Sequence, residues 1–422
     1  MKKLLIITEC FPPINRTASL RSGAWSRYLI HNGYFPIFVT AGENVSVADT
    51  YEKNDGYEVF RVECQSTFIN ELRHRFSGSL IGKVFGGIDL LFENWPFYSR
   101  LKSLEACAIE NILKQKPEGM IVSAPSFSLF LYAARISKKT GLRWVADYRD
   151  DWTTNEESSS FTRFKYIVFE RFLEKRSLKS ASAFFAVSNN QLRKIGNLVN
   201  KPGYLLENGY DLNRVPATNS HAKLPFDIDS RKVNIVYTGT LYNTQTLSFL
   251  ISVLSGLAQD AREMLSIYFV GVDKRQLLAY RELEKYYGST VFSCGRIDKE
   301  TADELLRLSD AALYIAYLDK KGNPIKGIPS SKLYEYIKIK KPVFMMPTDA
   351  DEAEQTLLSV GLGIYRVTPN ESRKVLEDMI KEKQFTGKVS IEVNEDAYKD
   401  ASCESRANKM ASYLDEIFKK GG

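Results

Sequence analysis

A short loop and the helix start that follows it, Ser330 to Glu335, carry residue types suited to binding a phosphate and a sugar. Ser330 and Ser331 stand where a loop containing Gly and Pro leads into a helical pattern, and Lys332 follows directly. Free N–H groups at a helix start, serine hydroxyls and a lysine charge together form an anion site suited to phosphate. Glu335 lies one turn further on, and its carboxylate can accept hydrogen bonds from two adjacent ribose hydroxyls. The alternative interpretation is a capped helix on which Lys332 and Glu335 are solvated.

Two other loops follow predicted strands of the same half of the chain. Gly239 and Thr240 follow the strand predicted at 233–238, and they offer close backbone approach and uncharged polar contacts to a phosphate or sugar. Arg296 and Ile297 follow the strand predicted at 291–294, where backbone groups and an arginine can contact a base. Taken alone, the loop that begins at Gly239 is better explained as an ordinary strand–helix connection. The three loops together indicate nucleotide binding.

The first half of the chain offers a different set of polar residues. Arg149, Asp150 and Asp151 follow the strand predicted at 144–147. A carboxylate there can orient an acceptor hydroxyl, and Arg149 can bind a phosphate. The alternative is a salt-bridged structural turn. The only histidines of the chain are at positions 31, 74 and 221, and their places at a helix end, in an aromatic segment and in a linker make them poor catalysts.

These residues require elements that bring them together. Short β-branched runs alternate with helical patterns, which is typical of parallel sheets with crossover helices. We therefore expect an α/β protein with two Rossmann-like, doubly wound domains facing a cleft. The predicted domains are 1–212, with 401–422 crossing back as a helix, and 213–400. The predicted strands are 4–8, 37–40, 58–62, 119–123, 144–147, 183–187, 233–238, 265–270, 291–294, 312–316 and 342–346; the predicted helices include 19–32, closed by Gly33, 247–257 and one that begins near 331.

Composition excludes several classes of protein. The 422 residues are 44% hydrophobic and 26% charged, which excludes a disordered chain. No apolar run reaches the ~18–20 residues of a membrane span. Five scattered cysteines form no Cys-x-x-Cys motif, which argues against a disulfide framework or zinc site and favours a cytoplasmic location.

The net charge of +7 is unevenly distributed. Residues 1–210 hold 28 Lys and Arg against 21 Asp and Glu, whereas the rest of the chain is neutral. The first half also contains a basic, aromatic-rich stretch, 72–104, which interrupts the strand–helix alternation. Such amphipathic material can lie on an anionic membrane surface, or it can be a helical insertion that packs on its own domain. Pure nucleic-acid binding is disfavoured because no known module is present.

Several of these stretches resemble the GT-B glycosyltransferases, particularly the retaining family-4 group that builds bacterial surface polysaccharides. The matching stretches are Tyr-Thr-Gly-Thr-Leu-Tyr (237–242), Phe-Ser-Cys-Gly-Arg-Ile (292–297), Ile-Pro-Ser-Ser-Lys-Leu-Tyr-Glu-Tyr (328–336), Lys-Lys-Pro-Val (340–343) and, more weakly, Asn-Gly-Tyr-Asp (208–211). They occur in the family's order over nearly the whole chain.

The resemblance implies a nucleotide-sugar donor bound mainly by the second domain. In that picture Glu335 holds the ribose, and Ser331 and Lys332 meet the diphosphate. Gly239 and Thr240 line the phosphate and sugar end, while 296–297 lie by the base. It implies no cofactor and no metal, because helix dipoles and basic side chains stabilise the leaving diphosphate.

The sequence also departs from the family pattern. Gly327 stands where the family often has a first glutamate, eight positions before Glu335, and 14–17 replace the usual Gly-Gly after the first strand. The basic residue that commonly follows Gly239 is missing, so Lys332, and Arg16 from the first domain, are the candidate replacement cations. We expect a glycosyltransferase that uses a nucleotide-sugar, UDP-sugar favoured, and a polyprenyl-diphosphate-linked or saccharide acceptor at the inner membrane surface. The alternatives are a nucleotide-sugar epimerase of the same fold and a non-catalytic nucleotide-sugar-binding protein.

Overall fold

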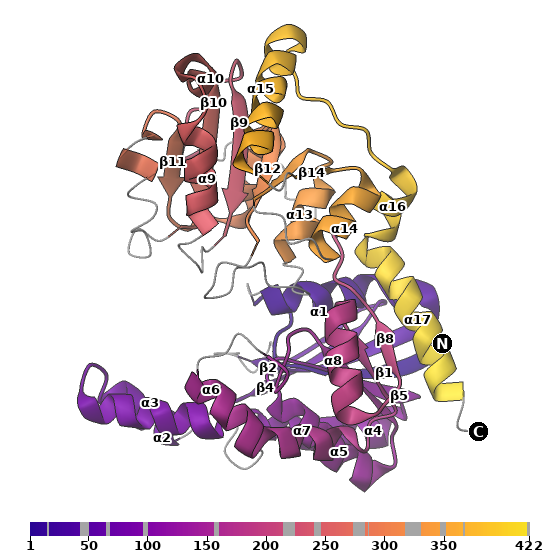
Figure 1. The fold of residues 1–422 in the computed structure, drawn as a ribbon. Coiled ribbons are helices and arrows are strands. Elements are labelled where there is room, and N and C mark those ends of the chain that lie inside the picture. The colour runs from indigo at the N-terminus through magenta and orange to yellow at the C-terminus, as the bar shows by residue number, and fades with distance from the viewer. Residues whose placement is uncertain are drawn as a thin grey trace. The chain divides into compact units, whose positions relative to one another are not determined.

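The computed structural model places the chain in two compact units. It describes residues 1–14, 17–42, 50–64, 68–95, 100–155, 160–213, 224–239, 246–272, 283–285, 287–316, 331–346, 352–365 and 368–419. Unit 1 comprises Met1–Asn208 and Cys403–Gly422, and unit 2 comprises Gly209–Ser402. Figure 1 shows that each unit is a sheet covered by helices on both faces.

Unit 1 is built on a sheet whose described strands have the order β3-β4-β2-β1-β5-β6-β7-β8. All neighbours pair in parallel except the edge strand β3, which is antiparallel to β4. The strands are β1 (Lys2–Thr8), β2 (Tyr34–Gly42), β3 (Tyr51–Lys53), β4 (Glu58–Glu63), β5 (Gly119–Ser123), β6 (Trp144–Tyr148), β7 (Ala183–Ala186) and β8 (Gly203–Leu205).

Strand β1 shows why this sheet needs two covering layers. Its run Leu4-Leu5-Ile6-Ile7 is buried on both sides. Leu5 and Ile7 belong to the hydrophobic cluster that includes residues of α4 (Ser103–Gln115) and α5 (Ser128–Thr140). Leu4 and Ile6 belong to the cluster that includes residues of α1 (Thr17–Tyr28) and α17 (Cys403–Lys419). A strand without polar alternation is therefore stable here, because neither face meets water.

The C-terminal helix α17 packs back on the first unit, as predicted from its periodicity. Several of its buried residues belong to the same hydrophobic cluster as Trp25 of α1 and Leu29. They include Met410, Leu414 and Ile417. The remaining helices of unit 1 are η1 (Ile30–Asn32), α2 (Phe68–Arg75), α3 (Leu80–Phe92), η3 (Arg100–Lys102), α6 (Ser160–Lys165), the π-helix η4 (Tyr166–Glu170), α7 (Arg171–Leu178) and α8 (Asn189–Val199).

Unit 2 contains a parallel sheet whose described strands have the order β11-β10-β9-β12-β13-β14. The strands are β9 (Val233–Thr238), β10 (Leu265–Val270), β11 (Val291–Cys294), β12 (Ala311–Tyr314), β13 (Val343–Met345) and β14 (Gly363–Tyr365). The helices are α9 (Thr246–Ser255), α10 (Gln259–Glu263), α12 (Lys299–Leu308), α13 (Ser331–Lys338), α14 (Glu352–Val360), α15 (Pro369–Thr386) and α16 (Glu395–Asp400).

The two ends of unit 2 lie side by side. The N–H of Tyr210 donates to the carbonyl of Ala401 at 3.1 Å, and Tyr210 forms an isolated β-bridge with Ser402. The Tyr210 ring also stacks on that of Tyr398 with centroids 4.6 Å apart. The chain therefore enters and leaves unit 2 at one point.

The predicted fold class is confirmed, and most predicted strands agree to within one or two residues. Strands 119–123, 233–238, 265–270 and 291–294 are found at the predicted bounds. The helix predicted at 19–32 is divided into α1 and η1, because the chain tightens into a 3-10 turn that ends at Gly33 with φ +80°. The predicted domain boundary near 213–229 lies largely outside the described residues.

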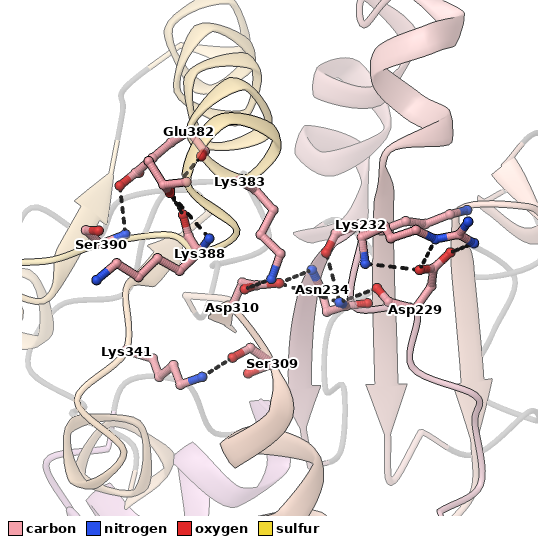
Figure 2. A network of polar contacts seen from close by, with 12 residues as sticks. Asp229, Lys232, Asn234, Ser309, Asp310, Lys341, Glu382, Lys383, Lys388 and Ser390 are labelled. Atoms are coloured by element: carbon pink, nitrogen blue, oxygen red, sulfur yellow. Dashed lines mark hydrogen bonds and ion pairs between the residues drawn. The ribbon is translucent and has the colours of Figure 1, made fainter.

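A buried charge pair joins α15 to the start of the unit 2 sheet. Asp310 Oδ1 accepts from Lys383 Nζ at 2.6 Å, and Asp310 Oδ2 accepts from the backbone N–H of Asn234 at 3.0 Å. The side chains of Asp310 and Lys383 are 9% and 11% exposed. Figure 2 shows Asp310 between Asn234 of β9 and Lys383 of α15. Asp310 therefore acts as a structural residue, in agreement with its sequence position at a helix end.

We expect Asp310→Ala to destabilise unit 2 by about 3 kcal/mol, because it leaves the Lys383 ammonium buried without its carboxylate. Hydrogen exchange of the β9 and β12 amides, followed by mass spectrometry, measures the free energy of opening of this unit by itself. Asp378→Ala is the control on the same helix, since Asp378 pairs with Lys381 at 3.9 Å with both side chains exposed. Its effect is expected below about 1 kcal/mol. Equal protection in both variants would contradict the structural role.

Candidate functional site

The carboxyl edge of the unit 2 sheet has the topology of a ligand site. Numbering the strands from β9 in chain order gives 3-2-1-4-5-6, so the connections run in opposite directions on the two sides of β9. In open parallel sheets, ligands bind outside the carboxyl ends of the strands at this switch point. Here it lies between β9 and β12, and Gly239 directly follows β9.

Gly239 and Lys332 are in close contact at this point. Gly239 has φ +110°, and a Cβ added to it would lie 2.3 Å from Cε and 2.7 Å from Nζ of Lys332. A side chain at this position is disfavoured chiefly by the backbone conformation, and it would also displace the end of the Lys332 side chain. Lys332 is the second residue of α13, so its charge adds to the exposed N–H groups of the first turn.

The ammonium group of Lys332 lies in a half-buried, aromatic environment. Nζ donates a hydrogen bond to the Tyr237 hydroxyl at 2.8 Å and lies 4.6 Å from the centre of that ring. Burial lowers the pKa of Lys332 to about 8. Bringing an anion to this cation would favour the protonated form, so the arrangement suits a phosphate or diphosphate.

Backbone groups connect the loops that follow the first three strands of this sheet. The N–H of Gly239 donates to the Val270 carbonyl at 2.7 Å, and the N–H of Gly271 donates to the Cys294 carbonyl at 3.2 Å. A Cβ on Gly271, which has φ +85°, would lie 3.3 Å from Gly239 Cα. The loops after β9, β10 and β11 are thus packed backbone to backbone. Arg296, which is exposed, and Ile297, which packs partly on the core, belong to the third of these loops.

Glu335 lies one turn along α13 from Lys332 and is held by an ion pair. Glu335 Oε2 accepts from Lys299 Nζ at 2.8 Å, and the same Nζ lies 2.6 Å from Asp303 Oδ1. Burial opposes the charge of Lys299, but the Glu335 and Asp303 carboxylates outweigh it and raise the pKa of Lys299. The Glu335 side chain is 24% exposed. Its orientation is fixed while it remains able to accept hydrogen bonds from a hydroxylated ligand.

The structure places the predicted nucleotide-binding residues as follows. Ser331 begins α13, with Lys332 and Glu335 on the same helix, and Gly239 is in contact with Lys332. The loop that carries Arg296 and Ile297 is bonded to Gly271, whose N–H donates to the carbonyl groups of residues 294 and 295. Gly271 in turn lies against Gly239. Ser330, Thr240 and Arg16 lie outside the described residues.

Three residues of this site, Gly271, Tyr237 and Lys299, were not among the site residues predicted from the sequence. Gly271 follows the strand 265–270 as Gly239 follows 233–238, so the same rule of a glycine after a buried strand would have identified it. Tyr237 and Lys299 carry no such signal. Their roles depend on contacts with Lys332 and Glu335 that are distant in sequence.

At the carboxyl edge of the unit 1 sheet, Asp147 is fully buried, at 0% exposure. It forms a two-point ion pair with Arg21 of α1, with Nη2–Oδ1 2.8 Å and Nε–Oδ2 3.2 Å. The Ser123 hydroxyl donates to Asp147 Oδ2 at 2.7 Å. Asp147 therefore fixes α1 to the ends of β5 and β6.

The predicted acceptor-side residues follow Asp147 in the turn after β6. Arg149 donates to the Ala18 carbonyl at 2.9 Å, so it helps to hold the start of α1. Asp151 lies 3.8 Å from Lys194. Asp150 is exposed. The turn thus has structural contacts at Arg149 and Asp151, and Asp150 is the carboxylate presented to solvent.

Within the described residues, no group of three or more His, Cys, Asp or Glu side chains is arranged to hold a metal ion. Across the same residues, none of the helices has the length and apolar character needed to cross a membrane.

Comparison with known proteins gives structural matches only. No family model and no curated protein matches the chain. Sucrose-phosphate synthase from Thermosynechococcus elongatus matches with a TM-score of 0.65 at 12% identity, covering 100% of both chains. A glycosyltransferase from Rickettsia africae matches with a TM-score of 0.63 at 14% identity, covering 100% of this chain and 99% of the other. Anabaena HepE, solved with UDP and glucose, matches with a TM-score of 0.58 at 12% identity, covering 99% and 100%. The chain has the GT-B fold.

The lowered pKa of Lys332 predicts how anion binding depends on pH. Below pH 8 the free ammonium is charged and the Kd for UDP should be independent of its titration. Above pH 8 the ammonium loses its proton, so the Kd should rise by up to about tenfold per pH unit. Isothermal titration calorimetry between pH 7 and 9.5 measures this change.

Lys332→Met should bind UDP more weakly at pH 7 and show a flat profile. Lys338→Met, at the other end of the same helix, is the control and should keep the wild-type profile. If the Kd for UDP of Lys332→Met still rises above pH 8 as that of the wild type does, the group that titrates is not Lys332.

Proposed function

We propose that this protein is a retaining glycosyltransferase that uses a nucleotide-sugar, UDP-sugar favoured, and transfers the sugar to a lipid-linked acceptor during bacterial surface polysaccharide assembly. The observation that carries the proposal is the half-buried Lys332 ammonium held against Gly239 at the switch point of the unit 2 sheet. A diphosphate placed there would have the ion-paired carboxylate of Glu335 within one helical turn.

The donor is proposed to bind along the carboxyl edge of unit 2. Its diphosphate meets the Lys332 ammonium and the N–H groups that begin α13. Its ribose hydroxyls donate to Glu335, which Lys299 holds in place. Arg296 and Ile297 contact the base. The preference for UDP is supported by the fold match to HepE, which has been solved with UDP and with UDP-glucose.

The chemistry requires little covalent participation by the protein. The bond between the anomeric carbon and the diphosphate oxygen breaks while a bond to the acceptor oxygen forms on the same face. The acceptor hydroxyl gives its proton to the departing phosphate. Negative charge grows on that phosphate, and a cation already in position stabilises it without reorganising solvent. Lys332 supplies that cation, and Asp150 is proposed to orient the acceptor hydroxyl.

The acceptor is proposed to be a polyprenyl-diphosphate-linked saccharide at the inner face of the cytoplasmic membrane. The excess positive charge of the first half supports an acidic partner on that side. The described residues of the basic, aromatic stretch 72–104 include the end of α2, α3, η3 and the start of α4. A phosphorylated lipid accounts for both features.

The experiment that tests this function is transfer from UDP- and GDP-sugars to lipid-linked acceptors extracted from bacterial membranes, with product stereochemistry read by NMR. Glu335→Ala should raise the KM for the donor about 10- to 100-fold, because hydrogen bonds to a charged group contribute about 1.5–3 kcal/mol. Lys299→Met should raise the KM in the same direction by a smaller factor, because the carboxylate remains and only its orientation is released.

Glu304→Ala is the matched control, since Glu304 lies on α12 and pairs at the surface with Arg307. Its KM should equal that of the wild type. Unchanged donor affinity in Glu335→Ala would overturn the ribose assignment. Failure of the wild type to bind any nucleotide-sugar would overturn the function itself.

A further inference from the structure

A helical segment of unit 1 exposes an unusual amount of apolar surface. The consecutive helices α6, η4 and α7 carry Phe164, Val168 and Phe172 at a spacing of four, with exposures of 57%, 51% and 65%. Ile167 and Phe169, at 51% and 41%, lie beside them. Isolated exposed apolar side chains are common, but a contiguous patch usually marks a contact surface.

Within the segment 162–179, the exposed charges are all of one sign. The two carboxylates of the segment 162–179, Glu170 and Glu174, have 0% exposure. Glu170 accepts hydrogen bonds from Asn94 and Trp152, and Glu174 accepts from Tyr148 and Thr153. Every exposed charged side chain of the segment is basic: Arg163, Arg171, Lys175, Arg176 and Lys179.

Helix α3 carries a second exposed apolar group. Leu80, Ile81 and Val84 are 78%, 53% and 56% exposed, and the cation Lys83 lies among them. On the α2–α3 hairpin, Asp89 pairs with Arg73 at 3.2 Å, and Glu71 is exposed. Figure 1 shows α2 and α3 projecting from unit 1 next to α6.

A buried lysine joins the two apolar groups. Lys165, at the end of α6, has 0% exposure, and its Nζ donates to the Leu90 carbonyl at 2.6 Å and to Glu93 Oε1 at 2.9 Å. The same Nζ lies 3.1 Å from Glu170 of η4. Because a buried ammonium is costly unless its partners stay in place, these contacts fix the hairpin against the helical segment.

We propose that α3 and the α6–η4–α7 segment form one docking surface for an anionic lipid bilayer. The apolar side chains at 164, 168, 172, 80, 81 and 84 enter the interfacial region of the bilayer. The surrounding Arg and Lys side chains contact lipid phosphates. This inference rests on the proposed function in one respect, because it names the membrane as the source of the acceptor.

Charge favours a bilayer over a protein partner as the occupant. Protein–protein interfaces are commonly depleted in charged side chains at their core, whereas on α6–η4–α7 every exposed charged side chain is a cation. Such a segment matches an anionic lipid surface, which attracts each nearby Lys or Arg. On α6–η4–α7 the carboxylates that would oppose this attraction are turned inward and hydrogen-bonded.

The docking surface is connected to the proposed acceptor turn. Trp152 Nε1 donates to Glu170 Oε2 at 2.6 Å, and the backbone N–H of Thr153 donates to Glu174 Oε2 at 3.3 Å. The residues that follow Asp150 and Asp151 are therefore bonded to the buried face of the docking helices.

The test is binding of the full-length protein to vesicles of phosphatidylcholine with and without 40% phosphatidylglycerol, measured by co-sedimentation. The wild type should bind the anionic vesicles, and more weakly at 0.5 M salt. The double variant F164S/F172S should lose at least tenfold in affinity, as should R171E/K175E. The matched controls are Phe385→Ser, at a Phe that is 93% exposed on α15, and Lys138→Glu, at an exposed Lys on α5; both should bind as the wild type does.

Wild-type binding by F164S/F172S would overturn the proposal, as would a wild-type dimer that the same substitutions convert to a monomer. Hydrogen exchange of the β1 and β5 amides in F164S/F172S should equal that of the wild type, which shows that unit 1 of the variant is folded. Vesicle binding without any nucleotide-sugar binding would overturn the proposed function and leave the docking surface standing. Binding of a nucleotide-sugar without binding to vesicles would overturn the docking surface and leave the proposed function standing.

Discussion

The ammonium group of Lys332 occupies the space that a side chain at position 239 would fill. This contact constrains much of unit 2. It involves a glycine with positive φ at the end of β9, a helix that begins close to that glycine, and the Tyr237 hydroxyl of β9, which accepts a hydrogen bond from the lysine. The loops that follow β9 and β10 contact each other through their backbones at this point, because Gly271 lies directly against Gly239. A cation kept half-buried in this way has its pKa lowered, and an approaching diphosphate supplies the charge that restores it.

Unit 1 uses a buried ion pair at the corresponding edge of its sheet. Arg21 and Asp147 hold the first helix against the ends of β5 and β6, and Arg21 also donates to the Leu206 carbonyl at 3.0 Å. Arg21 and Asp147 neutralise each other's charge, so the pair is not available to a ligand. It supports the turn after β6, which carries the residues predicted for the acceptor side. The two sheets thus share a topology while their carboxyl edges differ in chemistry. One presents a cation for a ligand, and the other has its charges neutralised internally.

Much of this architecture could be predicted from the sequence. Apolar runs such as 119–123 and 265–270 are buried on both faces, so their bounds follow directly from composition. Gly239, Lys332 and Glu335 were identified because helix starts and glycines after strands leave a local pattern. The pairing of Glu335 with Lys299 could not be predicted, because the two residues are 36 positions apart and meet only when α12 and α13 pack. The edge strands β3, β8 and β14 were also missed, since three residues are too few to show an alternation. The insertion 72–104 was recognised as amphipathic, but its apolar continuation on α6–η4–α7 depends on which carboxylates are buried, and that is a tertiary property.

The junction at Tyr210 and Ser402 gives unit 2 the form of an inserted module. Its first and last residues are joined by a backbone hydrogen bond and a stacked pair of tyrosines, so the sequence between them begins and ends at one place. Insertion or replacement of such a segment leaves the connectivity of the host sheet and its C-terminal helix unchanged. Recombination at these two positions can therefore exchange unit 2 without rebuilding the sheet of unit 1. In proteins built this way, the carboxyl edges of the two sheets can diversify independently.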